Sequence, residues 1–263
     1  MPAIALRQAA TADLSTFRQH LLHEKSLRPT TINRRLQSLR LFYRWLKPHH
    51  VAAENPAEHL RYLRTVRRPQ PTALKRSEVL ALVRAAAASP HGMAKRNVAL
   101  VQLLLQSGLR VSEVATLRQA EVQVGSRVGV VQVRAGKGLK ARQVPLNTTA
   151  RRALQSYQAT LPTVEPQQPV FFSKRATALS VRAIQSVIAE LARRAGITRL
   201  AVSAHTLRHT FAVHYLHQNP GKLIELANLL GHESLDTTAP YARPSADEVA
   251  DEVERSPLNV LSD

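Results

Sequence analysis

The sequence contains no cysteine. This absence excludes disulfides, zinc sites built on thiolates and a cysteine nucleophile. The opening residues MPAIALRQAA lack the basic region and long apolar run of a secretory signal peptide. No uninterrupted apolar run is long enough to span a bilayer. The sequence therefore predicts an intracellular protein with no membrane partner.

Acidic residues are also scarce. Asp and Glu number 18 against 37 Lys and Arg, which gives a formal net charge of +19. Such an excess strains a compact protein unless a polyanion balances it, and nucleic acid is the leading candidate. A basic protein without a polyanion partner is the alternative. We expect a cytoplasmic, nucleoid-associated protein that acts on DNA or RNA.

The chain of 263 residues, 44% of them hydrophobic, is long enough for one large domain or two smaller ones. The stretch RTVRRPQPTALKRSEV has two prolines, a basic cluster and no apolar period, which is typical of a linker. We place the boundary near Pro69. The predicted domains span residues 1–69 and 70–263.

Two helices are predicted in the first domain. The first carries Leu14 and Leu21 at helical spacing, with Thr11 or Asp13 as its N-cap. The second, TTINRRLQSLRLFYRWL, has arginines largely off its apolar stripe, and a helix of this kind can lie against DNA. A solvated basic face is the alternative. The stripe is expected to comprise Ile32, Leu36, Leu39, Phe42, Tyr43 and Leu46.

The spacing of apolar residues changes from a helical to an alternating pattern within the second domain. The valine-rich stretch EVQVGSRVGVVQVRAGKGLKARQVPL predicts three short antiparallel strands, with turns near Gly125–Ser126 and Gly136–Gly138. The flanking stretches are helical, with a break at Gly108 and with Ser77 and Ser112 as expected caps. The predicted fold class is mainly α with a small three-stranded antiparallel sheet.

The stretch HTLRHT has two histidines four residues apart, a spacing that can hold zinc. A zinc protease helix carries a glutamate beside the first histidine, but here Arg208 occupies the interval and its charge would repel a metal. An arginine fork matches two phosphate oxygens, and His205 lies three residues away on the same helical face. The alternative is an arginine that braces a carboxylate and a histidine satisfied in the core. We expect no metal and no cofactor.

Four stretches gain meaning when they are taken together: SGLRVSEVATL, the GKG turn, HTLRH and LLGHESLDTTAPYAR. In this order they resemble the tyrosine recombinase family of the Xer and phage-integrase type, from about Arg28 to Tyr241. The resemblance implies a truncated helical core-binding domain followed by a catalytic domain, arranged as a C-shaped clamp. It also implies that Glu113 is an acid that orients its neighbours. The implied catalytic residues are Arg110, Lys137, His205, Arg208, His232 and Tyr241.

The resemblance also implies contacts with double-stranded DNA recombination sites. The candidate DNA-binding residues are Thr30, Thr31, Asn33, Arg34, Arg35, Arg40 and Arg142.

Each implied role suits the residue type. The phenolate of Tyr241 attacks phosphorus and gives a 3′-phosphotyrosine and a free 5′-hydroxyl, which conserves the bond energy for rejoining. The two arginines stabilise charge on the nonbridging oxygens without a metal. Lys137 protonates the leaving oxygen, with Lys140 as its nearest rival. His205 assists proton removal from the tyrosine, and His232 hydrogen-bonds a phosphate oxygen.

Two features depart from the family pattern. Pro240 precedes Tyr241, so either a short helix begins at this proline or the tyrosine lies on a kinked or extended segment. The first domain corresponds to about the second half of the usual helical bundle, which predicts a weaker clamp in footprints of a single half-site. Two rivals remain: a type IB topoisomerase, and a DNA-binding protein that kept the fold and lost catalysis.

The resemblance further implies a homo-tetramer on two duplexes and a monomer when free. The acidic tail, with Val249, Val253 and Leu258 as apolar contacts, is expected to dock on the next protomer; a disordered tail is the alternative. Chromosome dimer resolution, plasmid resolution, phage integration and transposon resolution all use these residues.

Overall fold

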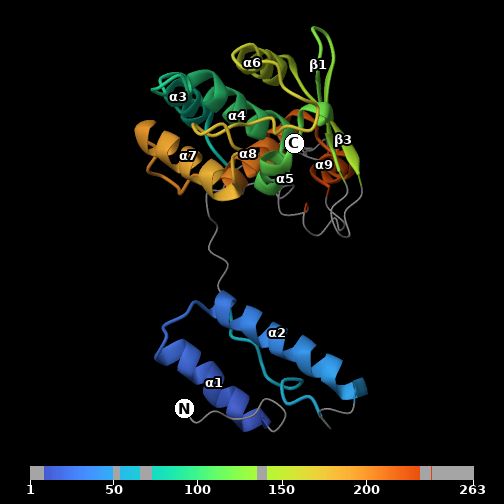
Figure 1. Cartoon of the computed structure of the whole chain (residues 1–263). Helices are drawn as coiled ribbons and strands as arrows, with labels where there is room; N and C mark the ends of the chain where they lie inside the picture. Colours follow the sequence, from blue (N-terminus) through green and yellow to red (C-terminus); the bar gives the residue numbers. More distant parts are fainter. Residues whose placement is uncertain (1–8, 50–53, 66–72, 135–140, 232–237, 239–263) are drawn as a thin grey trace, which may run out of the picture. The chain divides into compact units, whose positions relative to one another are not determined.

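The computed structural model describes residues 9–49, 54–65, 73–134, 141–231 and Thr238. The chain divides into two compact units, Met1–Gln70 and Pro71–Asp263. Each unit is described by itself (Figure 1). Within the described ranges, no helix has the length and apolarity needed to cross a membrane.

The N-terminal unit is built on two helices, α1 (Thr11–His23) and α2 (Pro29–Leu46), and α2 runs on into the 3-10 turn η2 (Lys47–His49). Pro29 occupies the first turn of α2, where its fixed φ suits the helix and its missing N–H costs nothing. The two helices bury Leu14 and Leu21 against Ile32 and Leu36.

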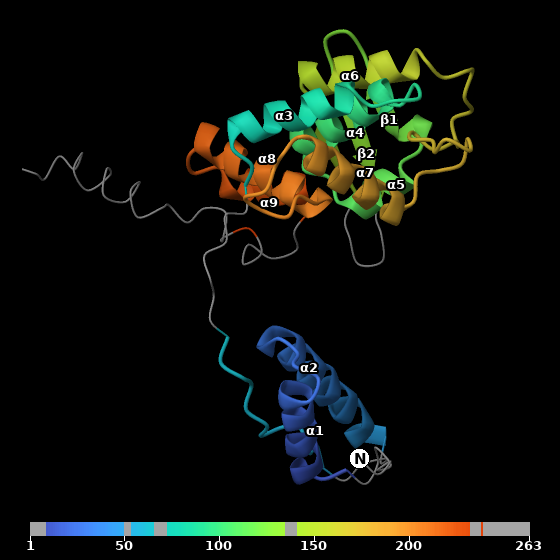
Figure 2. The same ribbon diagram turned by 90° about the vertical axis from the view of Figure 1, so that its left-hand side faces the viewer.

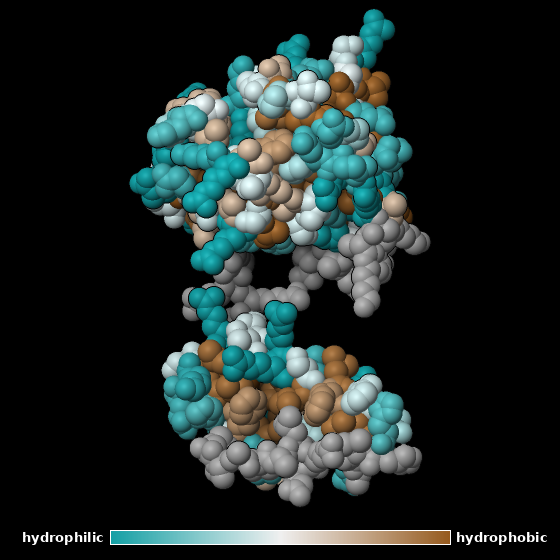
Figure 3. All heavy atoms as spheres, viewed as in Figure 1, coloured by the Kyte–Doolittle hydropathy of each residue, from teal (hydrophilic) through white to brown (hydrophobic). Residues whose placement is uncertain are grey.

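The predicted apolar stripe of α2 is confirmed except at one position. Ile32, Leu36, Tyr43 and Leu46 are buried and Leu39 is partly buried. Phe42 is 38% exposed because it lies one residue, or about 100° of helix rotation, from Tyr43, which takes the core position. Leu41 and Trp45 are exposed as well. Figure 3 shows that this unit has hydrophobic surface, in brown, on the side in view.

The C-terminal unit is mainly helical and is organised around α4 (Ala94–Ser107), in which nine of 14 residues are buried. Helices α3 (Arg76–Ala87), α6 (Thr148–Gln158) and α8 (Ala204–Gln218) pack on it, and α3, α4 and α6 lie side by side in Figure 2. The unit also contains α5 (Val111–Thr116), α7 (Val181–Arg194) and α9 (Leu223–Leu230).

A three-stranded antiparallel sheet follows α5 and the short 3-10 helix η3 (Gln119–Glu121), with strand order β1-β2-β3. Its strands are β1 (Val122–Val124), β2 (Gly129–Val133) and β3 (Arg142–Pro145). In the register, Val131 is the partner of both Val122 and Val144, so one face is lined by valines that join the core. The predicted fold class is confirmed. The expected turn at Gly136–Gly138 lies outside the described residues.

The predicted starts of α1, α3 and α5 are wrong by one to three residues. At α1, α3 and α5 the N-cap residues are Ala10, Lys75 and Arg110, none of which caps through its side chain. An acidic residue three positions later caps each helix instead, because its carboxylate accepts a hydrogen bond from the backbone N–H of the N-cap residue. The acids are Asp13, Glu78 and Glu113, at 2.8, 2.7 and 2.7 Å. Thr11, Ser77 and Ser112 are wrongly predicted as N-cap residues. Asp13 is not the N-cap residue either, but it caps α1 from the third helical position.

Candidate active site

The corner between α4 and α5 places the first predicted catalytic arginine. Gly108 ends α4 with φ +62, a conformation that side chains rarely adopt. An added Cβ would lie 2.4 Å from Cδ1 of Phe211 and 2.8 Å from Cδ2 of Leu230. Both the backbone conformation and the packing therefore require glycine here. The predicted break at Gly108 is confirmed.

Arg110 follows this corner and reaches the end of α9. Its Nη2 donates to the carbonyl oxygen of Gly231 at 2.8 Å, and its Nη1 donates to Oε1 of Glu113 at 3.2 Å. The side chain is 31% exposed, so part of the guanidinium faces solvent.

Arg208 approaches the same helix end from α8 and is buried, with 4% of its surface exposed. Its Nη1 donates to the carbonyl of Gly108 at 2.6 Å, although the two residues are 100 positions apart in the sequence. Its Nη2 donates to the carbonyl of Leu230 at 2.9 Å. These contacts fix the second predicted catalytic arginine.

The histidines of HTLRH lie in different surroundings. His205 is exposed in the first turn of α8. His209 is partly buried, and both this burial and the neighbouring His205 lower the pKa of its imidazole. His209 is therefore neutral at neutral pH.

A third arginine, Arg142, completes the arrangement from the first position of β3. Its Nε donates to the carbonyl of Leu229 at 2.8 Å. Its Nη1 and Nη2 donate to the two carboxylate oxygens of Glu113, both at 2.9 Å. Only 10% of the side chain is exposed. Its prediction as a DNA-binding residue stays a prediction, but each guanidinium nitrogen already has a protein acceptor.

Glu113 is the acid that joins two of these arginines. Its carboxylate accepts hydrogen bonds from the side chains of Arg142 and Arg110 and also from the backbone N–H of Arg110. Burial raises the pKa of Glu113, but the hydrogen bonds and charges of the two arginines outweigh burial and hold that pKa below its ordinary range. The carboxylate is therefore ionised at neutral pH.

The last turn of α9 receives all three guanidinium groups. The consecutive carbonyls of Leu229, Leu230 and Gly231 accept from Arg142, Arg208 and Arg110 in that order. These are carbonyls that a helix end leaves without an intrahelical partner, and the negative end of the helix dipole favours cations beside them. Strand β3 and α9 pack together at this point (Figure 1).

Gly231 was not among the predicted site residues, yet the arrangement depends on it. Its φ is +65, and an added Cβ would lie 2.7 Å from Nη1 and 2.9 Å from Cζ of Arg142. The sequence signal is a glycine that directly follows a helical stretch, which is typical of a left-handed helix end. Three other predicted catalytic residues lie outside the described residues: Lys137, His232 and Tyr241.

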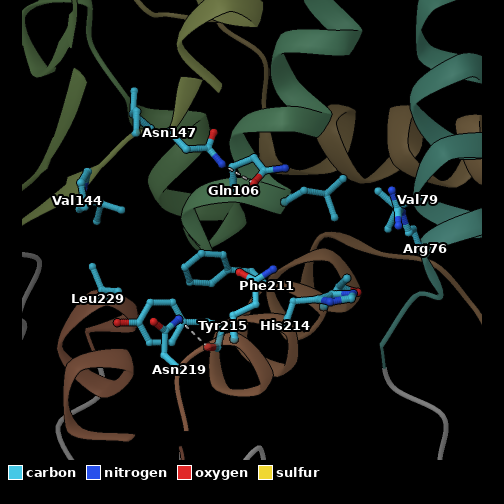
Figure 4. Close-up of a pocket in the computed structure, with 15 residues that line it drawn as sticks. Arg76, Val79, Gln106, Val144, Asn147, Phe211, His214, Tyr215, Asn219 and Leu229 are labelled. Atoms are coloured by element: carbon cyan, nitrogen blue, oxygen red, sulfur yellow. Dashed lines mark hydrogen bonds between the residues drawn. The ribbon is translucent and has the colours of Figure 1, made fainter. Parts of the chain in front are cut away.

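A groove of about 850 Å³ shares the residue Leu229 with the arginine cluster. Phe211 and Tyr215 of α8 line it together with Val144 of β3 (Figure 4). Asn147 donates to Gln106 across its rim at 2.7 Å. Leu229 contributes to both sites, since it lines this groove and its carbonyl accepts a hydrogen bond from Nε of Arg142.

The predicted DNA-binding residues of α2 separate into two groups. Asn33 exchanges two hydrogen bonds with the backbone of Leu63, at 2.9 and 2.8 Å. Arg40 donates to the carbonyl of Ala57 at 2.8 Å and lies over the ring of Tyr62 at 4.3 Å. These two side chains hold the segment 54–65 against α2. The exposed group comprises Thr30, Thr31, Arg34 and Arg35.

The mainly helical unit with its three-stranded sheet has the fold of tyrosine recombinase catalytic domains. The family model described as Phage integrase family matches residues 72–248. The chain belongs to this family.

Curated relatives are Xer proteins. The chain is 37% identical over 219 residues to the tyrosine recombinase XerC of Xanthomonas campestris pv. campestris, which covers 83% of this chain and 65% of that protein. It is 32% identical over 247 residues to the tyrosine recombinase XerD of Caulobacter vibrioides, with coverages of 91% and 79%. The chain thus spans somewhat less than two thirds of the length of the first relative.

Solved structures are similar along nearly the whole chain. The XerA recombinase has a TM-score of 0.61 at 25% identity and covers 96% of this chain and 86% of its own. The Tn1549 transposon integrase in complex with transposon right end DNA has a TM-score of 0.78 at 18% identity, with coverages of 96% and 87%.

Proposed function

We propose that this chain is a site-specific DNA recombinase that cleaves and rejoins DNA through a 3′-phosphotyrosyl intermediate. The observation that carries the proposal is the convergence of Arg110 and Arg208 on adjacent carbonyls of α9. Membership of the phage integrase family and the net charge of +19 support the same conclusion.

The two arginines suit phosphoryl transfer. The attack of a tyrosine on phosphorus spreads negative charge over the nonbridging oxygens, so fixed cations supply much of the catalysis. Arg208 is buried and held by two backbone carbonyls, which favours a fixed direction for its charge. Arg110 is partly exposed and has donors beyond its two contacts, which favours direct binding of a phosphate oxygen.

The remaining roles belong to the same proposal. Tyr241 is the nucleophile, Lys137 protonates the 5′-oxygen that leaves, and His232 hydrogen-bonds a phosphate oxygen. His205, exposed in the first turn of α8, accepts the proton of the tyrosine. The exposed residues of α2 bind the DNA backbone.

The proposed partners are double-stranded recombination sites and further copies of the chain. A tetramer on two duplexes performs strand exchange, and the free protein is a monomer in the cytoplasm. A related structure, a lambda integrase dimer bound to a COC′ core site, shows a family member with two copies on DNA. Size-exclusion chromatography with light scattering, on the free protein and on its complex with paired sites, measures both states.

The direct test is incubation with a nicked suicide substrate that traps a covalent protein–DNA adduct. We expect wild type to form the adduct and Tyr241→Phe to form none. Arg208→Lys keeps the charge but loses the fork, and we expect it to bind DNA normally and cleave about 100-fold more slowly. An undiminished adduct from Tyr241→Phe would refute the proposal.

The two rivals give different results in the same samples. A type IB topoisomerase would relax supercoiled plasmid without exchanging strands between two sites. A DNA-binding protein without catalysis would shift the substrate in a gel and give no adduct at all. Exchange of strands between two labelled sites by wild type therefore distinguishes the recombinase from both.

A further inference from the structure

Arg142 connects three elements that carry the proposed active site. It begins β3, its guanidinium binds Glu113 of α5 with both Nη atoms, and its Nε binds the carbonyl of Leu229 in α9. In the sequence, Lys137 lies five residues before it, and His232 directly follows the end of α9 at Gly231. One side chain thus joins the chain segments that lead to several of the proposed catalytic residues.

The surroundings of Arg142 are those of an interior ion pair. Its side chain is 10% exposed and that of Glu113 is 11% exposed. Both partners of such a pair are desolvated, so the geometry must be good for the pair to persist, and the two parallel bonds at 2.9 Å provide it. Gly231 leaves the space that the guanidinium occupies.

Glu113 transmits the position of Arg142 to Arg110. Its Oε1 accepts from Nη1 of both arginines, at 2.9 and 3.2 Å. Its Oε2 accepts from Nη2 of Arg142 at 2.9 Å and from the backbone N–H of Arg110 at 2.7 Å. The plane of the carboxylate is therefore fixed from both sides, and a shift of one arginine moves the acceptor of the other.

We propose that Arg142 is a positioning residue for strand cleavage, which acts through Glu113 and the last turn of α9 to hold the guanidinium of Arg110 against the scissile phosphate. The inference rests on the proposed function. It replaces a direct contact of Arg142 with DNA, because only 10% of this side chain is exposed and three of its five N–H donors already bind protein acceptors. Lysine cannot replace this residue, since a single ammonium does not span two carboxylate oxygens and a carbonyl.

The experiment is a double-mutant cycle on single-turnover cleavage of the suicide substrate. The four proteins are wild type, Arg142→Lys, Arg110→Lys and the double variant. We expect Arg142→Lys alone to lower the cleavage rate constant about 100-fold, the usual cost of a misplaced catalytic group. In the Arg110→Lys background the same change should cost less than about threefold, because the residue through which it acts is already lost.

DNA affinity at several salt concentrations separates positioning from direct contact. We expect the slope of log K against log salt to be the same for wild type and Arg142→Lys. In Arg142→Ala the slope should also be unchanged, whereas loss of a phosphate contact would reduce it by about 0.9. A reduced slope would overturn the proposal and restore Arg142 as a DNA-binding residue.

Stability measurements separate positioning from general damage. The double variant Arg142→Met with Glu113→Gln removes both charges together, and we expect it to fold and bind DNA but to cleave as slowly as Arg142→Lys. Positioning would be overturned if Arg142→Lys lowered the cleavage rate constant by the same factor in both backgrounds of the cycle. It would also be overturned if the cleavage rate constants of the variants fell in proportion to their melting midpoints. An absence of adduct from wild type would instead refute the proposed function, and this inference with it.

Discussion

Substitution of Gly231 by alanine tests the packing of the arginine cluster most directly. The residue has φ +65, and its new Cβ would lie 2.7 Å from Nη1 of Arg142. Gly196, which follows the C-cap residue of α7, is a matched control because its φ is +67 and an added Cβ would have no atom within 4 Å beyond its chain neighbours. Both variants place alanine in a left-handed helix end, and only one of them meets an arginine.

The expected magnitudes follow from this difference. A left-handed conformation costs an L-residue about 1–2 kcal/mol, so Gly196→Ala should lower the free energy of unfolding by about that amount. Gly231→Ala must also displace the guanidinium of Arg142, which loses hydrogen bonds to charged groups worth about 1.5–3 kcal/mol each. We expect it to cost about 2–3 kcal/mol more than the control and to slow cleavage in parallel.

Urea unfolding followed by far-ultraviolet circular dichroism measures these changes in the C-terminal unit. The sole tryptophan, Trp45, lies in the other unit, so its fluorescence is an internal control that should not change. In an Arg142→Ala background the obstacle is gone, and the two glycine variants should then agree within about 0.5 kcal/mol. Equal costs of the two variants in the wild-type background would refute the reasoning.

Three further predictions concern other contacts. Burial opposes ionisation of Glu113, but the two arginines lower its pKa in the folded protein. The carboxylate therefore contributes fully to stability above its unfolded pKa of about 4.3, and this contribution is lost as pH falls through the folded value. Between about pH 7 and pH 3 the urea midpoint of Glu113→Gln should therefore fall less than that of wild type. Asn33→Ala should destabilise the N-terminal unit by about 1–2 kcal/mol in Trp45 fluorescence, whereas Arg35→Ala should leave stability unchanged and reduce the salt slope of DNA binding by about 0.9. Thr210→Val should cost about 1–2 kcal/mol in urea, because its hydroxyl accepts from the backbone N–H of Leu74 at 2.9 Å; an unchanged midpoint would count against that bond.

The helices and strands could be predicted from the sequence because their periods are strong. The valine alternation predicts a sheet that the register of Val122, Val131 and Val144 confirms. Helix starts were predicted less well, since serines and threonines near a start are common cap residues. At α3 and α5 an acid in the first turn accepts a hydrogen bond from the backbone N–H of the N-cap residue. The pattern of Glu78 and Glu113, each just before an apolar stretch, is the signal for these two starts.

Arg142 shows which part of a site local patterns miss. Its partners Glu113 and Leu229 are 29 and 87 positions away, so no short window contains the contact. A signal did exist: Arg142 lies two residues before the buried Val144 on the same strand face, and an arginine on an inward face requires an interior acceptor.

Asn33 and Arg40 show that long-range contacts are also missed in a helix. They follow the helical spacing of the buried Leu36 and Tyr43, so they lie beside the apolar stripe rather than opposite it. They were predicted to contact DNA from their polarity alone. Position relative to the stripe distinguishes them from Arg34 and Arg35, which are exposed.

The attachment of Arg110 and Arg208 to backbone carbonyls of α9 has a consequence for their motion. A free arginine side chain carries about 2 kcal/mol of rotamer entropy, which an incoming anion must remove in order to be gripped. Arg110 and Arg208 lose this rotamer entropy when the chain folds, before any anion binds. A phosphate that enters between these groups meets cations whose directions are set beforehand, and its capture does not have to wait for them to stop moving.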